Sequence, residues 1–149
     1  AKIIKFKKWP PKYISIIFMF QKELAERIIG KFGTPQYGRL SILSNYRLKI
    51  INKFNVSPNC FFPKPKIIST VLNFVPHEIK DYKINNIENL EKITNIFFSN
   101  KRKMINKNIK KIFKTVKIIN SIKDLDLMSR PEDLKPEKYY EITKLFEKI

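Results

Sequence analysis

Apolar positions in the first third of the chain predict one strand followed by two helices. The first long apolar run covers residues 13–20 and is nearly continuous. Strands that are buried on both faces of a sheet have this pattern, which is typical of α/β proteins. Apolar residues then recur at helical spacing after Gln21, and Gly30 and Gly33 are expected to end that helix. A second helix is predicted to begin near Arg39.

Two further strands are predicted in the middle of the chain. The first covers residues 49–56, and the second covers residues 70–75 and ends at Pro76. Three prolines lie between them and force an extended loop, because proline disfavours helix for itself and for its predecessor. The order of strand, loop and strand predicts an antiparallel pair.

The pattern changes after Pro76. Residues 77–86 are polar and are interpreted as a linker, and apolar residues at helical spacing follow. The predicted helix faces are Ile87, Leu90, Ile93, Ile96 and Phe97, then Ile105, Ile109, Ile112 and Phe113, and finally Tyr139, Ile142, Leu145, Phe146 and Ile149 in a helix that begins near Pro136. Another short helix is expected after a break near Lys114 and Thr115. The fold class is therefore α/β: residues 1–76 form an α/β part, and residues 87–149 form a small all-helical domain.

Composition narrows the class of partner. The 149 residues carry a formal net charge of +18, which indicates a polyanion and most often nucleic acid. An AT-rich genome would also raise lysine, isoleucine and asparagine together. The single Cys60 and the single His77 exclude a disulfide framework within the chain and a cysteine- or histidine-rich metal site. The run at residues 13–20 is shorter than the roughly 20 residues of a membrane span, so we expect a cytoplasmic protein without a membrane partner.

Several catalytic motifs are missing from the sequence. With three glycines, the chain has neither a Gly-x-Gly-x-x-Gly sequence nor a Walker loop. Before Glu78 the only acidic residues are Glu23 and Glu26, whose spacing fits a solvated helix face better than a pair of catalytic carboxylates.

A basic cluster is the strongest chemical signal. No acidic residue lies between Glu91 and Asp124. The cluster consists of Lys101, Arg102, Lys103, Lys107, Lys110, Lys111, Lys114 and Lys117. From Lys103 to Lys114 the lysines are spaced along one side of a predicted helix, opposite its isoleucines. Because like charges at this spacing destabilise a helix, RNA along this side is a natural partner. An ordinary solvated face and a membrane-surface helix are the alternatives.

Adjacent aromatic residues form the second unusual feature. Phe61 and Phe62 lie in the proline-rich loop between two predicted strands, with Lys64 and Lys66 beside them. A stiff loop of this kind can hold an aromatic face towards a flipped base without an ordering cost. The alternative, which physical reasoning favours for each phenylalanine, is that the ring anchors the loop in the core.

Four segments in this order resemble the KsgA family of small-subunit rRNA adenine dimethyltransferases. They are residues 20–28 (FQKELAERI), 37–41 (YGRLS), 61–69 (FFPKPKIIS) and 98–103 (FSNKRK). The related Erm methyltransferases share the Phe-x-Pro-x-Pro-Lys loop. The resemblance covers nearly the whole chain and implies the last strands of a Rossmann-like methyltransferase sheet, followed by a helical rRNA-binding domain.

The resemblance also implies a reaction and roles for particular residues. The family transfers two methyl groups from S-adenosylmethionine to the exocyclic amine of adenines in small-subunit rRNA during ribosome biogenesis. Phe61 matches the loop phenylalanine that packs near the target adenine. Lys101, Arg102 and Lys103 match a basic segment linked to rRNA binding. Asn106 stands where an arginine is common, and the nearby Lys107, Lys110 and Lys111 are expected to compensate.

The resemblance further implies that part of the enzyme lies outside this sequence. The glycine-rich cofactor loop and an Asn-Leu-Pro-Tyr-type catalytic motif are absent, and the family pattern places both before Ala1. We therefore expect this chain alone to bind no cofactor and to be inactive. Two hypotheses remain open: a fragment of a complete enzyme, and a non-catalytic RNA-binding or ribosome-assembly module. The strand at residues 13–20 would lack one neighbour, which predicts self-association or pairing with a separate N-terminal half.

Overall fold

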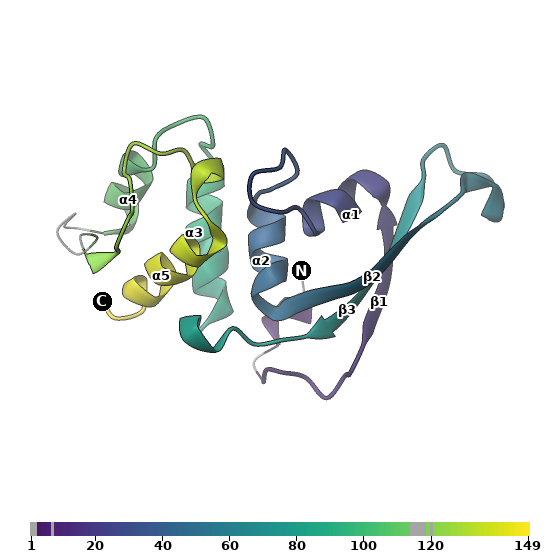
Figure 1. Ribbon diagram of the computed structural model, residues 1–149, viewed down its shortest axis with the longest axis horizontal. Coiled ribbons are helices and arrows are strands. Elements are labelled where there is room, and N and C mark those ends of the chain that lie inside the picture. The colour runs from purple at the N-terminus through teal and green to yellow at the C-terminus, as the bar shows by residue number, and fades with distance from the viewer. Residues whose placement is uncertain (1–2, 7, 114–118, 120) are drawn as a thin grey trace.

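A small antiparallel sheet and a group of helices lie side by side along the long axis of the molecule (Figure 1). The computed structural model describes residues 3–6, 8–113, 119 and 121–149. The strands are β1 (Ile16–Gln21), β2 (Leu48–Val56) and β3 (Ser69–Pro76), in the order β1-β3-β2. Both pairs are antiparallel, which confirms the pair predicted from the sequence.

The sheet buries one face against two helices. Those helices are α1 (Lys22–Ile28) and α2 (Arg39–Arg47), and both begin close to the predicted positions. Alternate residues of the central strand, Thr70, Leu72 and Phe74, are buried. Successive side chains of a strand point to opposite faces, so these residues define the face that packs towards the helices.

The expectation that the first strand is buried on both faces is wrong for this chain. Ile17 is 64% exposed and Met19 is 53% exposed. Two causes act together: β1 is an edge strand bonded only to β3 among the described residues, and the helices lie on one side of the sheet, where α1 packs against it. The same order leaves β1 at one edge of the sheet among the described residues, and its pairing with another polypeptide stays a prediction.

The second half of the chain is helical, as predicted. Its helices are α3 (Ile87–Phe98), α4 (Asn106–Ile112) and α5 (Pro136–Phe146). The Asn86 side chain caps α3 by accepting a hydrogen bond from the amide of Glu88 at 3.0 Å. Ile149 was expected in the buried face of the last helix but is 74% exposed, because α5 ends at Phe146. The short helix expected after Lys114 falls largely outside the described residues.

Short 3-10 turns connect these elements. They are η1 (Ile3–Lys5), η2 (Pro58–Cys60), η3 (Lys80–Tyr82) and η5 (Pro131–Asp133). The predicted linker at residues 77–86 therefore contains one turn of helix. No helix among the described residues has the length and apolar character needed to cross a bilayer.

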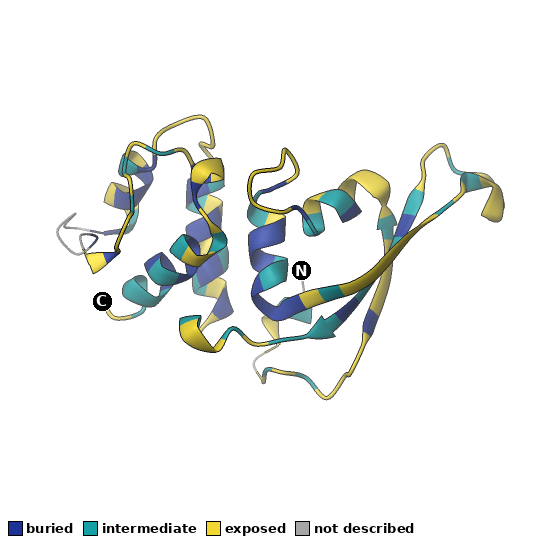
Figure 2. Ribbon diagram, viewed as in Figure 1, coloured by how far each residue is buried: buried dark blue, intermediate teal, exposed yellow. Residues whose placement is uncertain are grey.

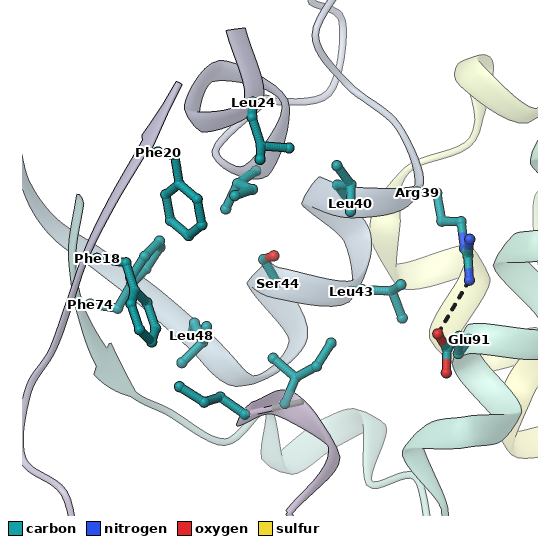
Figure 3. A pocket seen from close by; sticks show the side chains of 13 residues that line it. Phe18, Phe20, Leu24, Arg39, Leu40, Leu43, Ser44, Leu48, Phe74 and Glu91 are labelled. Atoms are coloured by element: carbon teal, nitrogen blue, oxygen red, sulfur yellow. Dashed lines mark hydrogen bonds and ion pairs between the residues drawn. The ribbon is translucent and has the colours of Figure 1, made fainter. Parts of the chain in front are cut away.

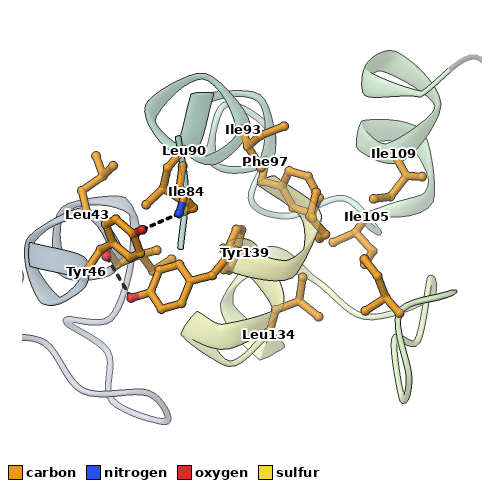
Figure 4. Close-up of a cluster of buried hydrophobic side chains, with 14 of the residues drawn as sticks. Leu43, Tyr46, Ile84, Leu90, Ile93, Phe97, Ile105, Ile109, Leu134 and Tyr139 are labelled. Carbon is orange, nitrogen blue, oxygen red and sulfur yellow. Dashed lines mark hydrogen bonds between the residues drawn. The ribbon is translucent and has the colours of Figure 1, made fainter. Parts of the chain in front are cut away.

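The main core joins α2 to the later helices (Figures 2 and 4). Ile42, Leu43 and Tyr46 of α2 pack in one buried cluster with residues of α3, α4 and α5, such as Leu90. A smaller cluster under the sheet includes Leu48, the residue that follows α2. The division of the chain at residues 77–86 stays a prediction, with α2 shared between its two sides.

Arg47, at the end of α2, binds the N-terminal segment around Ile4 and Phe6 through hydrogen bonds. Its guanidinium donates hydrogen bonds to the carbonyls of Ile4 and Phe6, the latter at 2.8 Å, and lies 4.8 Å from the centre of the Trp9 ring. The Trp9 indole in turn donates to the carbonyl of His77 at 2.8 Å. Burial lowers the pKa of Arg47 from its ordinary value. Three chain segments therefore meet at one buried cation.

Four buried tyrosines tie the helices together through hydroxyl groups. Each donates a hydrogen bond to a backbone carbonyl: Tyr37 to Leu134 (2.7 Å), Tyr46 to Tyr82 (3.0 Å), Tyr139 to Pro131 (2.6 Å) and Tyr140 to Ile42 (3.3 Å). Burial raises the pKa of all four hydroxyls, because the charged phenolate is poorly solvated in the core.

We predict that Ile42→Ala lowers the free energy of unfolding by about 2–5 kcal/mol, because it leaves a cavity in the shared core. Leu40→Ala, on the same helix, is the matched control because Leu40 is 41% exposed. Its effect should be below about 1 kcal/mol. Urea denaturation followed by circular dichroism measures both, and equal losses would contradict the role given to α2.

We also predict that the buried Tyr37, Tyr139 and Tyr140 stay protonated in the folded chain at about pH 11, where free tyrosine is ionised. Their folded pKa values are raised, so the unfolded chain releases these protons first. The stability that they contribute is complete below about pH 10 and is lost as the pH rises further. Phenolate absorbance at about pH 11 should be clearly lower in buffer than in guanidinium. Matching absorbances before any unfolding would refute the prediction.

Candidate RNA-binding surface

The basic segment Lys101, Arg102 and Lys103 lies in the turn after α3, and all three side chains are exposed. The amide of Lys103 donates to the carbonyl of Asn100 at 2.9 Å, which closes the turn. The segment therefore presents three cations to solvent on a short connection between two packed helices.

The prediction that the lysines from Lys103 to Lys114 lie along one side of a helix is only partly correct. Lys107, Lys110 and Lys111 are exposed on α4, but Lys103 precedes that helix. The cause is local: the amides of residues 105 and 106 donate to the carbonyls of residues 129 and 127, at 2.9 and 3.1 Å. These two hydrogen bonds change the direction of the chain before α4 begins, so Lys103 is not part of that helix. Lys114 and Lys117 lie outside the described residues.

One side of α4 is buried in the core, which fixes the position of the helix that carries these lysines. Ile105 and Ile109 are fully buried, and so is Asn108, whose side-chain amide donates to the carbonyl of Phe97 at 3.4 Å. The side-chain oxygen of Asn106 is buried and has no hydrogen-bond partner among the described residues. Exposed lysines thus stand on a helix whose opposite side is fixed in the core.

Lys101 also borders a cavity whose lining includes two arginines. The cavity has a volume of about 330 Å³ and is lined by Arg27 from α1, Arg39 from α2, Lys101 and Glu132, among others. Sequence reasoning missed this convergence because the three cations are far apart in the chain. A signal was present nonetheless: residues 27–77 contain no acidic side chain.

The two arginines are held by carboxylates nearby. Arg27 pairs with Glu23 on α1 at 2.5 Å, and Arg39 pairs with Glu91 of α3 at 3.3 Å. Lys5 pairs with the same Glu91 at 2.5 Å, and this hydrogen bond raises the pKa of Lys5. The side-chain Nε of Arg39 is buried and has no partner among the described residues. Arg39 therefore keeps donor capacity next to the cavity.

The aromatic loop occupies the opposite end of the molecule. It joins β2 and β3 at the tip of a long arm, far from α4 (Figure 1). Phe61 is half-buried, and Phe62 is completely exposed. Neither ring belongs to a buried cluster, so the alternative that both phenylalanines anchor the loop in the core is wrong for Phe62. The structure does not bring the loop and the basic segment together.

A larger cavity lies between the sheet and the helices (Figure 3). Its volume is about 600 Å³, and its lining is mainly apolar, with Phe18, Phe20 and Phe74 on one side. The ion pair between Arg39 and Glu91 lies at its edge. Neither Glu23 nor Glu26 lines it. Among the described residues, no three histidine, cysteine, aspartate or glutamate side chains are placed to hold a metal ion.

Comparison with known proteins places this fold in a family. The family model described as ribosomal RNA adenine dimethylase matches residues 3–148. The chain belongs to this family. It is 42% identical over 135 residues to the ribosomal RNA small subunit methyltransferase A of Pelagibacter ubique, covering 91% of this chain and 51% of that protein. It is 36% identical over 143 residues to the enzyme of the same name from Zymomonas mobilis, covering 96% and 50%.

Solved structures support the fold of this adenine dimethylase family member. A dimethyladenosine transferase from Plasmodium falciparum gives a TM-score of 0.71 at 23% identity, covering 93% of this chain and 59% of that one. The 23S rRNA methyltransferase ErmE gives 0.57 at 16% identity, covering 93% and 57%. The predicted α/β methyltransferase class and the resemblance to the KsgA family are thereby confirmed. The chain spans about half the length of the curated relatives it matches.

Proposed function

We propose that this chain is the RNA-binding part of an rRNA adenine dimethyltransferase, which transfers methyl groups from S-adenosylmethionine to adenines of small-subunit rRNA. The observation that carries the proposal is the match to the adenine dimethylase family over residues 3–148. The substrate would be rRNA within a small-subunit pre-ribosomal particle, and the protein would act in the cytoplasm.

The described residues do not fit S-adenosylmethionine. The larger cavity is lined mostly by apolar side chains, and its one carboxylate, Glu91, already pairs with Lys5 and Arg39. A nucleoside needs free polar groups for its hydroxyls and its base. Three widely separated glycines supply no close backbone approach. We therefore assign cofactor binding to the part of the relatives that this chain does not span.

What this chain supplies is RNA binding and presentation of the target base. Lys101, Arg102 and Lys103 would neutralise backbone phosphates, and Lys107, Lys110 and Lys111 on α4 would extend the contact. The cavity that Lys101 shares with Arg27 and Arg39 suits a phosphate that lies deeper in the surface. Most of the affinity in such an interface comes from phosphates and is independent of sequence.

Phe61 would act on the target adenine itself. An adenine must leave its stack before its amine can be methylated, and an aromatic face stabilises the flipped base. The amine is a poor nucleophile because its lone pair is delocalised into the ring. Polar acceptors that localise this lone pair would come from the same absent part as the cofactor site.

A second function remains a candidate: a non-catalytic RNA-binding or ribosome-assembly module. The poor fit of the described residues to the cofactor favours it. Sequencing the DNA upstream of Ala1 separates the two. A reading frame continuous with this chain that encodes the glycine-rich loop identifies a part of the enzyme, whereas a stop codon in that frame identifies the module.

The free edge of β1 would pair with another polypeptide. Ile17 and Met19 are exposed on this strand, and no described strand pairs with its outer edge. An apolar edge of this kind is a site for strand pairing. The partner would be a separate N-terminal half or a second copy of this chain.

We predict strongly salt-dependent binding to structured RNA. Replacing Lys101, Arg102 and Lys103 by alanine should flatten the slope of log affinity against log salt by about two to three units, because each neutralised phosphate contributes close to one. Fluorescence anisotropy with a labelled RNA hairpin over a range of salt concentrations measures the slope.

The matched control removes the same charge elsewhere. Lys80, Lys123 and Lys148 are exposed lysines outside the basic segment, and their replacement by alanine should change the slope by less than about one unit. Equal effects of the two triple variants would show that net charge alone governs binding, and would place the RNA surface elsewhere.

We predict that the isolated chain self-associates through β1. Sedimentation velocity should show dimers or larger species that dissociate in the Ile17→Lys, Met19→Lys double variant, because charge on an edge strand opposes pairing. Lys53→Glu on β2 is a control at the other edge of the sheet. A soluble monomer at high concentration, or dissociation caused by the control alone, would rule out the β1 edge.

A further inference from the structure

Phe62 is the most exposed large apolar side chain among the described residues, at 102% of its reference area. It belongs to the loop that joins β2 and β3 at the end of a projecting arm (Figure 1). A phenylalanine ring gains free energy when it leaves water, so the fully exposed Phe62 has apolar area available to a binding partner.

The backbone of the loop before Phe62 is restricted. Ser57 accepts a hydrogen bond from the amide of Asn59 at 3.2 Å, and the amides of Cys60 and Phe61 donate back to residues 57 and 58. Pro63 and Pro65 follow and restrict the backbone further. A loop whose backbone is already restricted loses less entropy when a ring that it carries stacks on a planar group.

Phe61 and Phe62 differ in exposure, because Phe61 is half-buried and Phe62 is completely exposed. Phe61 has φ −124° and ψ 149°, which is extended conformation. Successive side chains of an extended backbone alternate in direction. The half-buried Phe61 and the exposed Phe62 therefore offer two different ring surfaces, and each can take a base of its own.

The charge around the loop selects the kind of partner. Lys64 and Lys66 are exposed beside Phe62, Lys53 is exposed on β2, and residues 27–77 contain no acidic residue. Aromatic rings among lysines bind single-stranded nucleic acid, because the rings stack on bases while the lysines contact phosphates. The polar side chains of Ser57 and Asn59 near the tip fit RNA better than a lipid surface.

We propose that Phe62 stacks on an unpaired nucleobase next to the adenine that Phe61 contacts, and so forms a second base-binding position. This inference rests on the proposed function, because it takes the RNA at the loop to be the methylation substrate. Phe62 increases the affinity for single-stranded RNA by stacking on a base and not by charge.

The test compares two polyanions. Phe62→Ala should weaken binding to a single-stranded RNA oligomer by about 5- to 100-fold and leave binding to heparin unchanged, because heparin has charge but no bases. Phe62→Tyr should restore RNA binding. Phe54→Ala is the matched control, because Phe54 lies on β2 of the same arm and is 57% exposed. The control should retain RNA binding.

Each other outcome has a defined meaning. Unchanged RNA affinity in Phe62→Ala, or an equal loss on heparin, overturns the proposal. Lost binding to phosphatidylserine vesicles with intact RNA binding also overturns it and makes the loop a membrane contact. If Phe62→Ala binds RNA normally while the Lys101, Arg102 and Lys103 triple variant does not, the proposal fails and the proposed function stands. If the unmodified chain binds heparin but no RNA, the proposed function itself fails.

Discussion

The buried guanidinium of Arg47 is the constraint on which the arrangement of sheet, helices and N-terminal segment depends. It lies at the junction of α2 and β2 and has no carboxylate within ion-pair distance among the described residues. Two backbone carbonyls and the Trp9 ring take the place of a counter-ion. Burying a charge is expensive unless its donors are satisfied, so the cation and the segment that satisfies it are ordered together.

This junction places the RNA surface relative to the sheet. α2 begins at Arg39, beside the cavity that Lys101 borders, and ends at Arg47, beside the strands. Its middle is buried in the main core through Ile42 and Leu43. A rigid helix therefore separates the basic segment from the aromatic loop by a fixed distance. An RNA that reaches both would have to extend along the length of the molecule (Figure 1).

Local patterns predicted the elements well, because their causes are local. Asn86 caps α3, Pro136 starts α5, and Gly33 has a φ of +80°, which few other residues adopt. At Gly30 a Cβ would lie 2.5 Å from the carbonyl oxygen of Gln36, so a stop signal read from the sequence also reflects a close approach of two backbones.

Features that depend on distant contacts could not be predicted in the same way. The exposure of Ile17 follows from which strand lies beside β1, and a hydrophobic pattern contains no information about that. The convergence of Arg27, Arg39 and Lys101 depends on the packing of three elements. The resemblance named the basic segment and Phe61, but only the structure distinguishes the half-buried Phe61 from the exposed Phe62.

The order of the strands in the sheet has a consequence for synthesis on the ribosome. β3 is central, so β1 has no partner in this chain until β3 has been made, about 50 residues later. At ordinary elongation rates this interval lasts roughly 3 to 10 s. Meanwhile α1 and α2 can form from local contacts, while the apolar side chains of β1 stay unpaired. If β3 is the first strand available to β1, the apolar side chains of β1 stay exposed for this interval, whose length depends on the order of the strands and not on overall stability.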